Sequence, residues 1–329
     1  MFFKCDNCGG NVVYDPYSGK MHCPHCESEN SQKMVHNTGD MKQCINCGAP
    51  MDSEIREFTS ACKCPNCGMY TILEPRVDGE FKPDLILPFK ISKNGAVEIL
   101  KKEFGNRKFT PLSFLSNASI DKMEGAYVPF FLYDYHVIGS YHGKCSKTRV
   151  WEEGDRRYKE VSYFAVDREV EADYANVPAD ASLERNNRAM DLLEPYKYAD
   201  LHDFDPKYMS GFMGELFSEK ADQTEDRAKA KVFNSMDSIV RSSLSQYDTV
   251  YAGSNIDSQL KGYKYALLPV WEYIFRYRGN NYRFYVNGQT GKVIGKTPVD
   301  RSLVLAYGGT VFALLAIVGE FIVHFCSLL

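Results

Sequence analysis

The sequence predicts two zinc ribbons at the N-terminus, an α+β core with an antiparallel sheet, and one transmembrane helix at the C-terminus. Four CxxC pairs stand before residue 68, and the chain ends in a long apolar run. Between them, helical and strand-like apolar patterns alternate. The domains expected from these observations are residues 1–30 (first ribbon), 40–75 (second ribbon), 79–300 (core) and 302–329 (transmembrane helix).

The cysteines indicate a reducing compartment. Nine of the 11 cysteines fall before residue 68, and eight of these nine form CxxC pairs. In a secreted chain such a content would suggest disulfides. However, the N-terminal segment MFFKCDNCGG has no apolar run and no cleavage site, so it is not a signal peptide. We therefore expect reduced, metal-bound cysteines in the cytosol.

The spacing of the CxxC pairs is typical of zinc sites. Each pair places two sulfurs on one tight turn, and tetrahedral zinc takes four thiolates. Gly9, Gly48 and Gly68 directly follow the second cysteine of three pairs, where glycine allows the chain to turn. A redox role would need only one pair beside a βαβ unit. The pattern predicts two zinc ions in two sites, the first formed by Cys5, Cys8, Cys23 and Cys26 and the second by Cys44, Cys47, Cys64 and Cys67.

Two details of the metal sites stay open in the sequence. His22 and His25 flank Cys23 and could ligate, although four cysteines already close that site. Cys62 stands two residues before Cys64 and could replace it as the fourth ligand of the second site, although a spare thiol is favoured.

The charge of the ribbon region argues against nucleic acid as its partner. Residues 1–70 contain six Lys or Arg and eight Asp or Glu, a formal charge of −2. A zinc ion with four thiolates adds about −2 per site, so the loaded ribbons are near −6. Nucleic-acid affinity depends on neutralising phosphates with basic residues. A protein-contact or structural role is therefore favoured, and a nucleic-acid-associated protein held at the membrane is the alternative.

The C-terminal run predicts a single membrane span. Residues 302–319 are 18 consecutive uncharged residues, which span about 27 Å as a helix. A buried helix of a soluble protein is the alternative. The basic residues near the run all precede it: Lys292, Lys296 and Arg301. The positive-inside rule then places the bulk of the chain in the cytoplasm. Glu320 and His324 follow the run one helical turn apart and would share a face.

Between residues 79 and 300 the pattern mixes strands and helices. PDLILPFKIS is apolar and strand-like, and NGAVEILKKEFG predicts a helix that ends at Gly105. The longest helix expected in the core runs from Asp222 to Leu244 and begins with a capping box formed by Asp222 and Glu225.

An internal echo suggests that the core contains two related units, residues 79–150 and 210–297. AYVPFFLYDYHVIGSY at residue 126 resembles ALLPVWEYIFRYRGNN at residue 266, with Pro129 matching Pro269. Each segment predicts a strand, a turn and a returning strand. The second continues to Asn287-Gly288, a hairpin signal.

The chain contains no recognisable catalytic motif. It has no Ser/His/Asp order, phosphate loop or HExxH helix. Asp134, His136 and His142 would share one face of a strand, which a half-buried strand explains better than an active site does. We therefore expect no catalytic or small-molecule cofactor residues, and an enzyme is the third alternative.

Five segments carry a resemblance over nearly the whole chain: CDNCGGNVVYDPYSGKMHCPHC, GEFKPDLILPFKI, YVPFFLYD, FDPKYMSGF and LLPVWEYIFRYRGNNYRFYVNGQTGKV. Together they resemble a bacterial family of membrane proteins with a transcription-factor-IIB-type (TFIIB-type) zinc ribbon. Some members carry a primosomal-helicase label, but this chain has no helicase motifs. The resemblance implies that the two four-cysteine sets are the metal ligands.

The same resemblance suggests protein partners. Some relatives are encoded beside a phage-shock-protein-A homologue or a band-7-like protein. This implies a membrane-anchored adaptor that binds such membrane-stress proteins at the cytoplasmic face, in an envelope-stress response.

Overall fold

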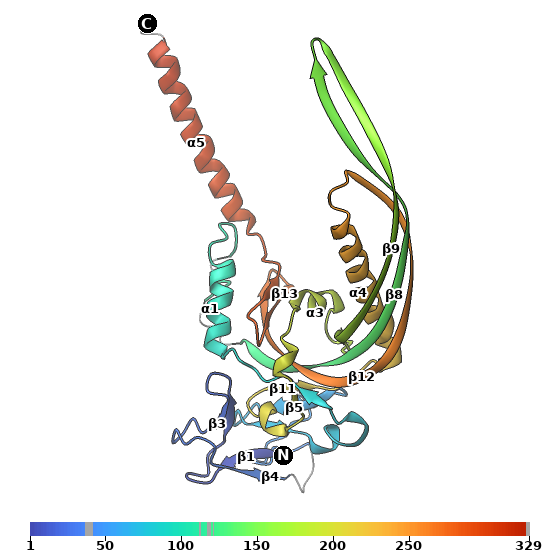
Figure 1. Ribbon diagram of the computed structural model, residues 1–329. Helices are drawn as coiled ribbons and strands as arrows, with labels where there is room; N and C mark the ends of the chain where they lie inside the picture. Colours follow the sequence, from blue (N-terminus) through green and yellow to red (C-terminus); the bar gives the residue numbers. More distant parts are fainter. Residues whose placement is uncertain (37–41, 112, 117–119, 121, 327–329) are drawn as a thin grey trace.

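The computed structural model describes residues 1–326 except residues 37–41, 112, 117–119 and 121, and the side chains from residue 323 onward lie outside the described part. The expected relation between Glu320 and His324 therefore concerns a side chain that is not described. The ribbons lie at one end of the body, and two features project from the other end (Figure 1). One is the C-terminal helix and the other is a long curved β-structure.

A ten-stranded sheet forms the centre of the molecule. Its main path runs in the order β10-β7-β12-β8-β11-β5-β6, while β13 and β14 extend from β12, and β9 pairs with β8. Most of its pairings are antiparallel, as expected, but β12–β7 and β11–β8 are parallel. The strands are β5 (Thr59–Lys63), β6 (Tyr70–Ile72), β7 (Leu85–Ile86), β8 (Glu124–Glu153), β9 (Arg156–Asp180), β10 (His202–Asp203), β11 (Met213–Glu215), β12 (Thr249–Tyr277), β13 (Asn280–Asn287) and β14 (Val293–Gly295).

The two ribbons differ in their relation to this sheet. The first ribbon contains two small antiparallel pairs, β1 with β4 and β2 with β3. The second ribbon contributes β5 and β6 to the central sheet itself, because β11 pairs with β5 on one side and with β8 on the other. The strands of the first ribbon are β1 (Phe2–Cys5), β2 (Val13–Asp15), β3 (Lys20–His22) and β4 (Gln32–Val35).

Helices cover parts of the sheet. The 12-residue helix α1 (Lys93–Phe104) forms where NGAVEILKKEFG predicted it; Ser92 caps its start by accepting from the Gly95 N–H, and Gly105 follows its end. Helix α4 (Ala221–Ser243) lies along the concave side of the long strands (Figure 1). The shorter helices are α3 (Asn187–Leu193), η1 (Glu74–Arg76), η2 (Gly79–Phe81), η3 (Tyr198–Asp200) and η4 (Pro206–Met209).

The predicted start of α4 was wrong in detail. The helix begins at Ala221, and the side chain of Gln223 accepts from the backbone N–H of Lys220 at 2.7 Å. Asp222 therefore lies inside the first turn, where its negative charge is favourable near the helix N-terminus. The expected capping box of Asp222 and Glu225 does not form.

The long strands correct the expectation drawn from the internal echo. The first echo segment does not turn near Gly139, because β8 continues through it and pairs with Ile256 of β12 and Val170 of β9. The second segment does turn, at Arg278 and Gly279, which both have positive φ, and returns as β13. The two echo segments are antiparallel neighbours.

Three long strands continue away from the body as a curved extension. We call residues 135–174 together with residues 249–260 the arm. Along it β8 pairs with β12 on one side and with β9 on the other. The pairing of β12 ends at Thr249 opposite Ser146, so the tip of the arm consists of β8 and β9 alone (Figure 1).

The strand predicted from PDLILPFKIS is much shorter than expected. Only Leu85 and Ile86 pair, as β7 between β10 and β12. Beyond this point, Phe89 turns inward and stacks on Phe212 at a ring-centroid distance of 4.1 Å. Its side chain is fully buried, so packing rather than strand pairing holds this segment.

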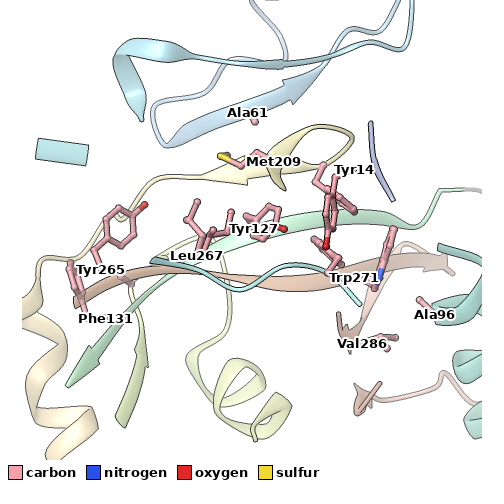
Figure 2. Close-up of a cluster of buried hydrophobic side chains, with 14 of the residues drawn as sticks. Tyr14, Ala61, Ala96, Tyr127, Phe131, Met209, Tyr265, Leu267, Trp271 and Val286 are labelled. Carbon is pink, nitrogen blue, oxygen red and sulfur yellow. The ribbon is translucent and has the colours of Figure 1, made fainter. Parts of the chain in front are cut away.

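The core extends into both ribbons. Tyr14 of the first ribbon and Ala61 of the second belong to the same buried cluster as Tyr127 and Trp271 (Figure 2). Successive strand residues point to opposite faces, and the even-numbered neighbours, such as Val128, belong to a second cluster. The ribbons are thus packed into the core.

Candidate metal centres

The first four-cysteine set is assembled in the structure. The sulfurs of Cys5, Cys8, Cys23 and Cys26 all lie within 4.8 Å of one another. The distance from Cys5 Sγ to Cys26 Sγ is 3.6 Å, and that from Cys8 Sγ to Cys23 Sγ is 3.5 Å. Four sulfurs placed tetrahedrally at about 2.3 Å from a zinc ion are about 3.8 Å apart. The arrangement can therefore hold a metal ion of that size.

The second set has the same geometry. The sulfurs of Cys44, Cys47, Cys64 and Cys67 also lie within 4.8 Å of one another. The distances between Cys44 and Cys67 and between Cys47 and Cys64 are both 3.7 Å, measured from sulfur to sulfur. In each set the first cysteine of one pair lies against the last cysteine of the other.

All four CxxC turns use the same local backbone. The residue after each pair has a positive φ, between +61° and +72°. Its N–H donates to the carbonyl of the first cysteine of the pair, at 2.7–2.9 Å. Glycines occupy this position in three turns, as predicted, but Glu27 occupies it in the fourth, with φ +61°. A left-handed conformation is unfavourable for a residue with a Cβ, so glycine marks such a turn in a sequence whereas Glu27 does not.

Polar groups around one sulfur of each set favour its thiolate form. Ser28 Oγ lies 3.1 Å from Cys26 Sγ, and hydrogen bonds from the Ser28 side chain and backbone lower the pKa of Cys26 to about 5. The Ala49 backbone and Asn66, whose Nδ2 donates at 3.6 Å, lower the pKa of Cys47 to about 6. Such outer donors commonly orient ligands and tune metal sites. Spacing arguments alone missed these residues.

The remaining candidate ligands stay outside both clusters. The described metal-binding groups contain neither His22 nor His25. Cys62 is fully buried on β5, two residues before Cys64, but is not a member of the second set. Burial raises its pKa to about 11, and it packs in the apolar cluster around Phe2. Cys64 rather than Cys62 therefore completes the second site.

The chemistry of the two sites follows from their ligands. Four cysteines fill a tetrahedral coordination sphere and leave no position for water or substrate, which is the pattern of structural rather than catalytic sites. Tetrahedral sulfur ligation suits zinc or iron. The two groups are therefore suited to hold the ribbons together.

The structure does not bring Asp134, His136 and His142 into one site. Asp134 Oδ1 accepts from the backbone N–H of Asn176 at 2.8 Å. His136 Nδ1 lies 2.8 Å from Asp173, and His142 Nδ1 lies 3.0 Å from Asp167. These are separate cross-strand contacts between β8 and β9, which place both histidines in ordinary pairs on the sheet surface.

A cavity of about 300 Å³ lies where the two ribbons meet the core. Its aromatic wall includes Phe212 and Trp271, and Trp271 Nε1 donates to the Ile91 carbonyl at 2.9 Å. Asp15 also lines it, but its carboxylate accepts from the N–H groups of the Tyr17–Ser18 turn. Asp15 is thus engaged in holding the hairpin of the first ribbon.

The C-terminal helix α5 (Arg301–Cys326) is long and apolar enough to cross a membrane. An 18-residue window within residues 301–322 has a mean hydropathy of 2.0, and none of that window is buried in the body. Its described contacts with the body lie near its start, where the Tyr307 ring packs against Phe109 at 5.5 Å. Asp300 Oδ1 accepts from the Ser302 N–H at 2.9 Å and caps the helix.

Comparison with known proteins gives one informative relationship. No family model matches the chain, and no solved structure matches it. The chain is 34% identical over 326 residues to the "Uncharacterized protein YdjG" of Bacillus subtilis (strain 168). The alignment covers 95% of this chain and 96% of that protein. The similarity spans nearly the full length of both proteins, and the chain belongs to the same family as YdjG of Bacillus subtilis.

Proposed function

We propose that the protein is a membrane-anchored zinc-ribbon adaptor that binds other proteins at the cytoplasmic face and has no catalytic role. The observation that carries this proposal is α5, a 26-residue apolar helix attached to a body that buries none of its first 22 residues. An exposed apolar surface of this size needs a lipid or protein environment. Its length matches a bilayer core of about 30 Å.

The orientation follows from charge and redox chemistry. Lys292, Lys296 and Arg301 precede the apolar stretch, and cytoplasmic flanks carry such an excess of basic residues. The thiolates of the metal centres also require a reducing compartment. The basic flank and the thiolates both support a cytoplasmic location for the ribbons and the core.

Zinc is the metal that fits the proposed role. The closed four-cysteine sites would supply folding free energy, typically about 10–16 kcal/mol for a structural zinc. Because the second ribbon pairs with the core sheet through β11, the metal would fix the geometry of the core edge as well as its own hairpin. The ions are thus assigned a structural role in presenting a binding surface.

The tip of the first ribbon offers a partner contact. Tyr17 lies at the turn between β2 and β3, and 92% of its surface is exposed. Exposed aromatic residues are frequent energetic centres of protein interfaces. The charge of the loaded ribbons, near −6, disfavours nucleic acid. The family resemblance suggests phage-shock-protein-A-like or band-7-like membrane-stress proteins as partners.

Site-specific photo-crosslinking in intact cells tests this function. A photoreactive phenylalanine at position 17 is expected to form one discrete protein adduct, identified by mass spectrometry. The matched control carries the probe at Leu183, which is 67% exposed on the core, and should not form it. Salt-sensitive retention of the purified chain on DNA, with no adduct from position 17, would instead favour the nucleic-acid alternative.

A further inference from the structure

The outer edge of the arm is a long strand with one free side. β9 pairs with β8 from Arg156 to Asp180, and within the described part of the chain no strand pairs with its other side. Free edges present a row of backbone donors and acceptors that can pair with another strand. Proteins usually shorten or interrupt such edges, yet β9 has 25 residues and its first proline is Pro178.

Charge along β9 is divided between its two halves. Arg157 and Lys159 are exposed in the half near the tip. The other half carries acidic side chains at four successive positions on the same face of the strand. All four are exposed: Asp167, Glu169, Glu171 and Asp173. Since antiparallel pairing of a strand with its own copy reverses its direction, the basic half would lie opposite the acidic half.

We propose that the β9 edge pairs antiparallel with β9 of a second copy of this chain, with Phe164 of each copy on the two-fold axis. In this register Arg157 faces Glu171 of the second copy, and Lys159 faces its Glu169. Glu160 faces Arg168 of the second copy, and the symmetry repeats all three pairs. Directly opposite residues in antiparallel strands have Cβ atoms about 5 Å apart, so these ions can pair.

The register is selected by the sequence. A slip of one residue would place outward side chains opposite inward ones. A slip of two residues in either direction forms only two complementary charge pairs instead of three. On the face of β9 opposite the acidic residues, the selected register places Phe164 against Phe164 of the second copy. A two-fold dimer requires a self-complementary surface, and this edge has that property.

The dimer goes beyond the adaptor function, which does not depend on it. The described contacts of α5 with the body involve its first two turns, at Tyr307. These contacts do not involve β9, the strand that pairs in the proposed dimer. The contact residues of β9 also lie far along the sequence from Tyr17, so the two surfaces can be tested separately.

Charge reversal in the full chain, purified in detergent, tests the proposal by sedimentation equilibrium. Wild type should dimerise, and R157E/K159E and E169K/E171K should each weaken its association constant roughly 100-fold. An equimolar mixture of the two variants should restore dimerisation, because every pair is then complementary. The variant with all four reversals should also dimerise with itself. A fold defect could weaken each variant but could not produce this mutual rescue.

A crosslink fixes the symmetry axis. Phe164→Cys, treated in native membranes with a short thiol crosslinker, should give a covalent dimer. Val150→Cys, which is exposed on β8 and not on the pairing strand β9, should not. Two results would overturn the proposal: a wild-type chain that stays monomeric at all concentrations, or a dimer that ignores the charge reversals and shows no rescue on mixing.

Discussion

Ser210 donates a hydrogen bond from its Oγ to the backbone carbonyl of Val12 at 2.6 Å, across 198 positions of the chain. Ser210 lies just before β11, and Val12 lies just before β2 of the first ribbon. The backbone N–H of Tyr14 in turn donates to the Ser210 carbonyl at 2.9 Å. The first ribbon is thus joined to the core by buried, directional hydrogen bonds, and loss of its metal should weaken these bonds.

Ser210→Ala should loosen the first ribbon without altering its metal ligands. The change leaves the buried Val12 carbonyl without this donor, which typically costs about 1–3 kcal/mol. We expect a lower midpoint in chemical unfolding and faster loss of one metal ion to a chelator. Ser245→Ala, at an exposed position, is the matched control and should behave like wild type.

Cys64→Ser should remove one metal ion per chain, whereas Cys62→Ser should leave two. Cys64 belongs to the second four-cysteine set and Cys62 does not. Elemental analysis of the purified chain measures the difference. In the Cys64 variant, hydrogen exchange should also speed up at Gly214, which pairs with Ala61 of β5. Two zinc ions in the Cys64 variant, or iron in wild type, would refute the assignment.

Glu27→Gly should stabilise the first ribbon. Glu27 has φ +61° at the position that glycine occupies in the other three turns, and relieving a left-handed conformation is worth about 1 kcal/mol. The reverse change at an equivalent turn, Gly48→Ala, should destabilise the second ribbon by a similar amount. Resistance to metal loss under chelator measures both; a faster loss in the Glu27 variant would contradict the turn assignment.

Asp180 should make stability fall as the pH rises. Burial raises its pKa to about 6, and neither carboxylate oxygen has a hydrogen-bond partner in the described structure. The folded state therefore holds the proton more tightly than the unfolded chain. Below about pH 4 the carboxyl group is neutral in both states, and the destabilisation grows as the pH rises from about 4 to about 6 and is constant above that. Asp180→Asn should raise the unfolding free energy at pH 8 by about 2–3 kcal/mol.

The comparison between Asp180→Asn and wild type is made from pH 8 to pH 5, and the two proteins carry the same thiolate ligands, so any effect of pH on the metal sites is common to both. The stabilisation should be nearly constant from pH 8 to about pH 6.5 and shrink between about pH 6 and pH 5, because wild-type Asp180 then takes up its proton. Asp155→Asn, exposed at the tip of the arm, should show no such trend. A difference that is constant with pH would mean that Asp180 is not the titrating group.

Local features of the fold were predictable from the sequence. CxxC spacing sets the geometry of a single turn, so both cysteine clusters could be named in advance. Helix α1 followed from its apolar face, and the β13–β14 hairpin followed from Asn287-Gly288. In each case the information lies within a few neighbouring residues.

Features that depend on distant partners could not be predicted. β11 joins the second ribbon to β8 through three residues, Met213–Glu215, that have no strand pattern of their own. The length of β8 escaped prediction because its outer part is held by cross-strand pairing rather than by burial. Glu27 shapes the first metal centre through its backbone conformation and Ser28 through hydrogen bonds to Cys26, and CxxC spacing reveals neither.

Introducing Arg at Leu314 should impair membrane insertion. Leu314 lies near the middle of the apolar stretch and is exposed. A charge there costs about 2.5–3.5 kcal/mol on insertion scales. Leu314→Ala is the matched control and should insert normally. Alkaline extraction of membranes, followed by immunoblotting, measures the fraction inserted; equal insertion of both variants would argue against a spanning helix.

Fractionation of cells that express the full chain or a chain lacking residues 303–329 tests the central claim most directly. The full chain should stay in the membrane pellet after a high-salt wash, and protease added outside intact cells should leave its body uncut. The truncated chain should be soluble and retain two zinc ions, because neither metal site involves α5. A truncated chain that stays in the washed pellet, or ribbons cut by external protease, would contradict a cytoplasmic zinc-ribbon protein anchored by its C-terminal helix.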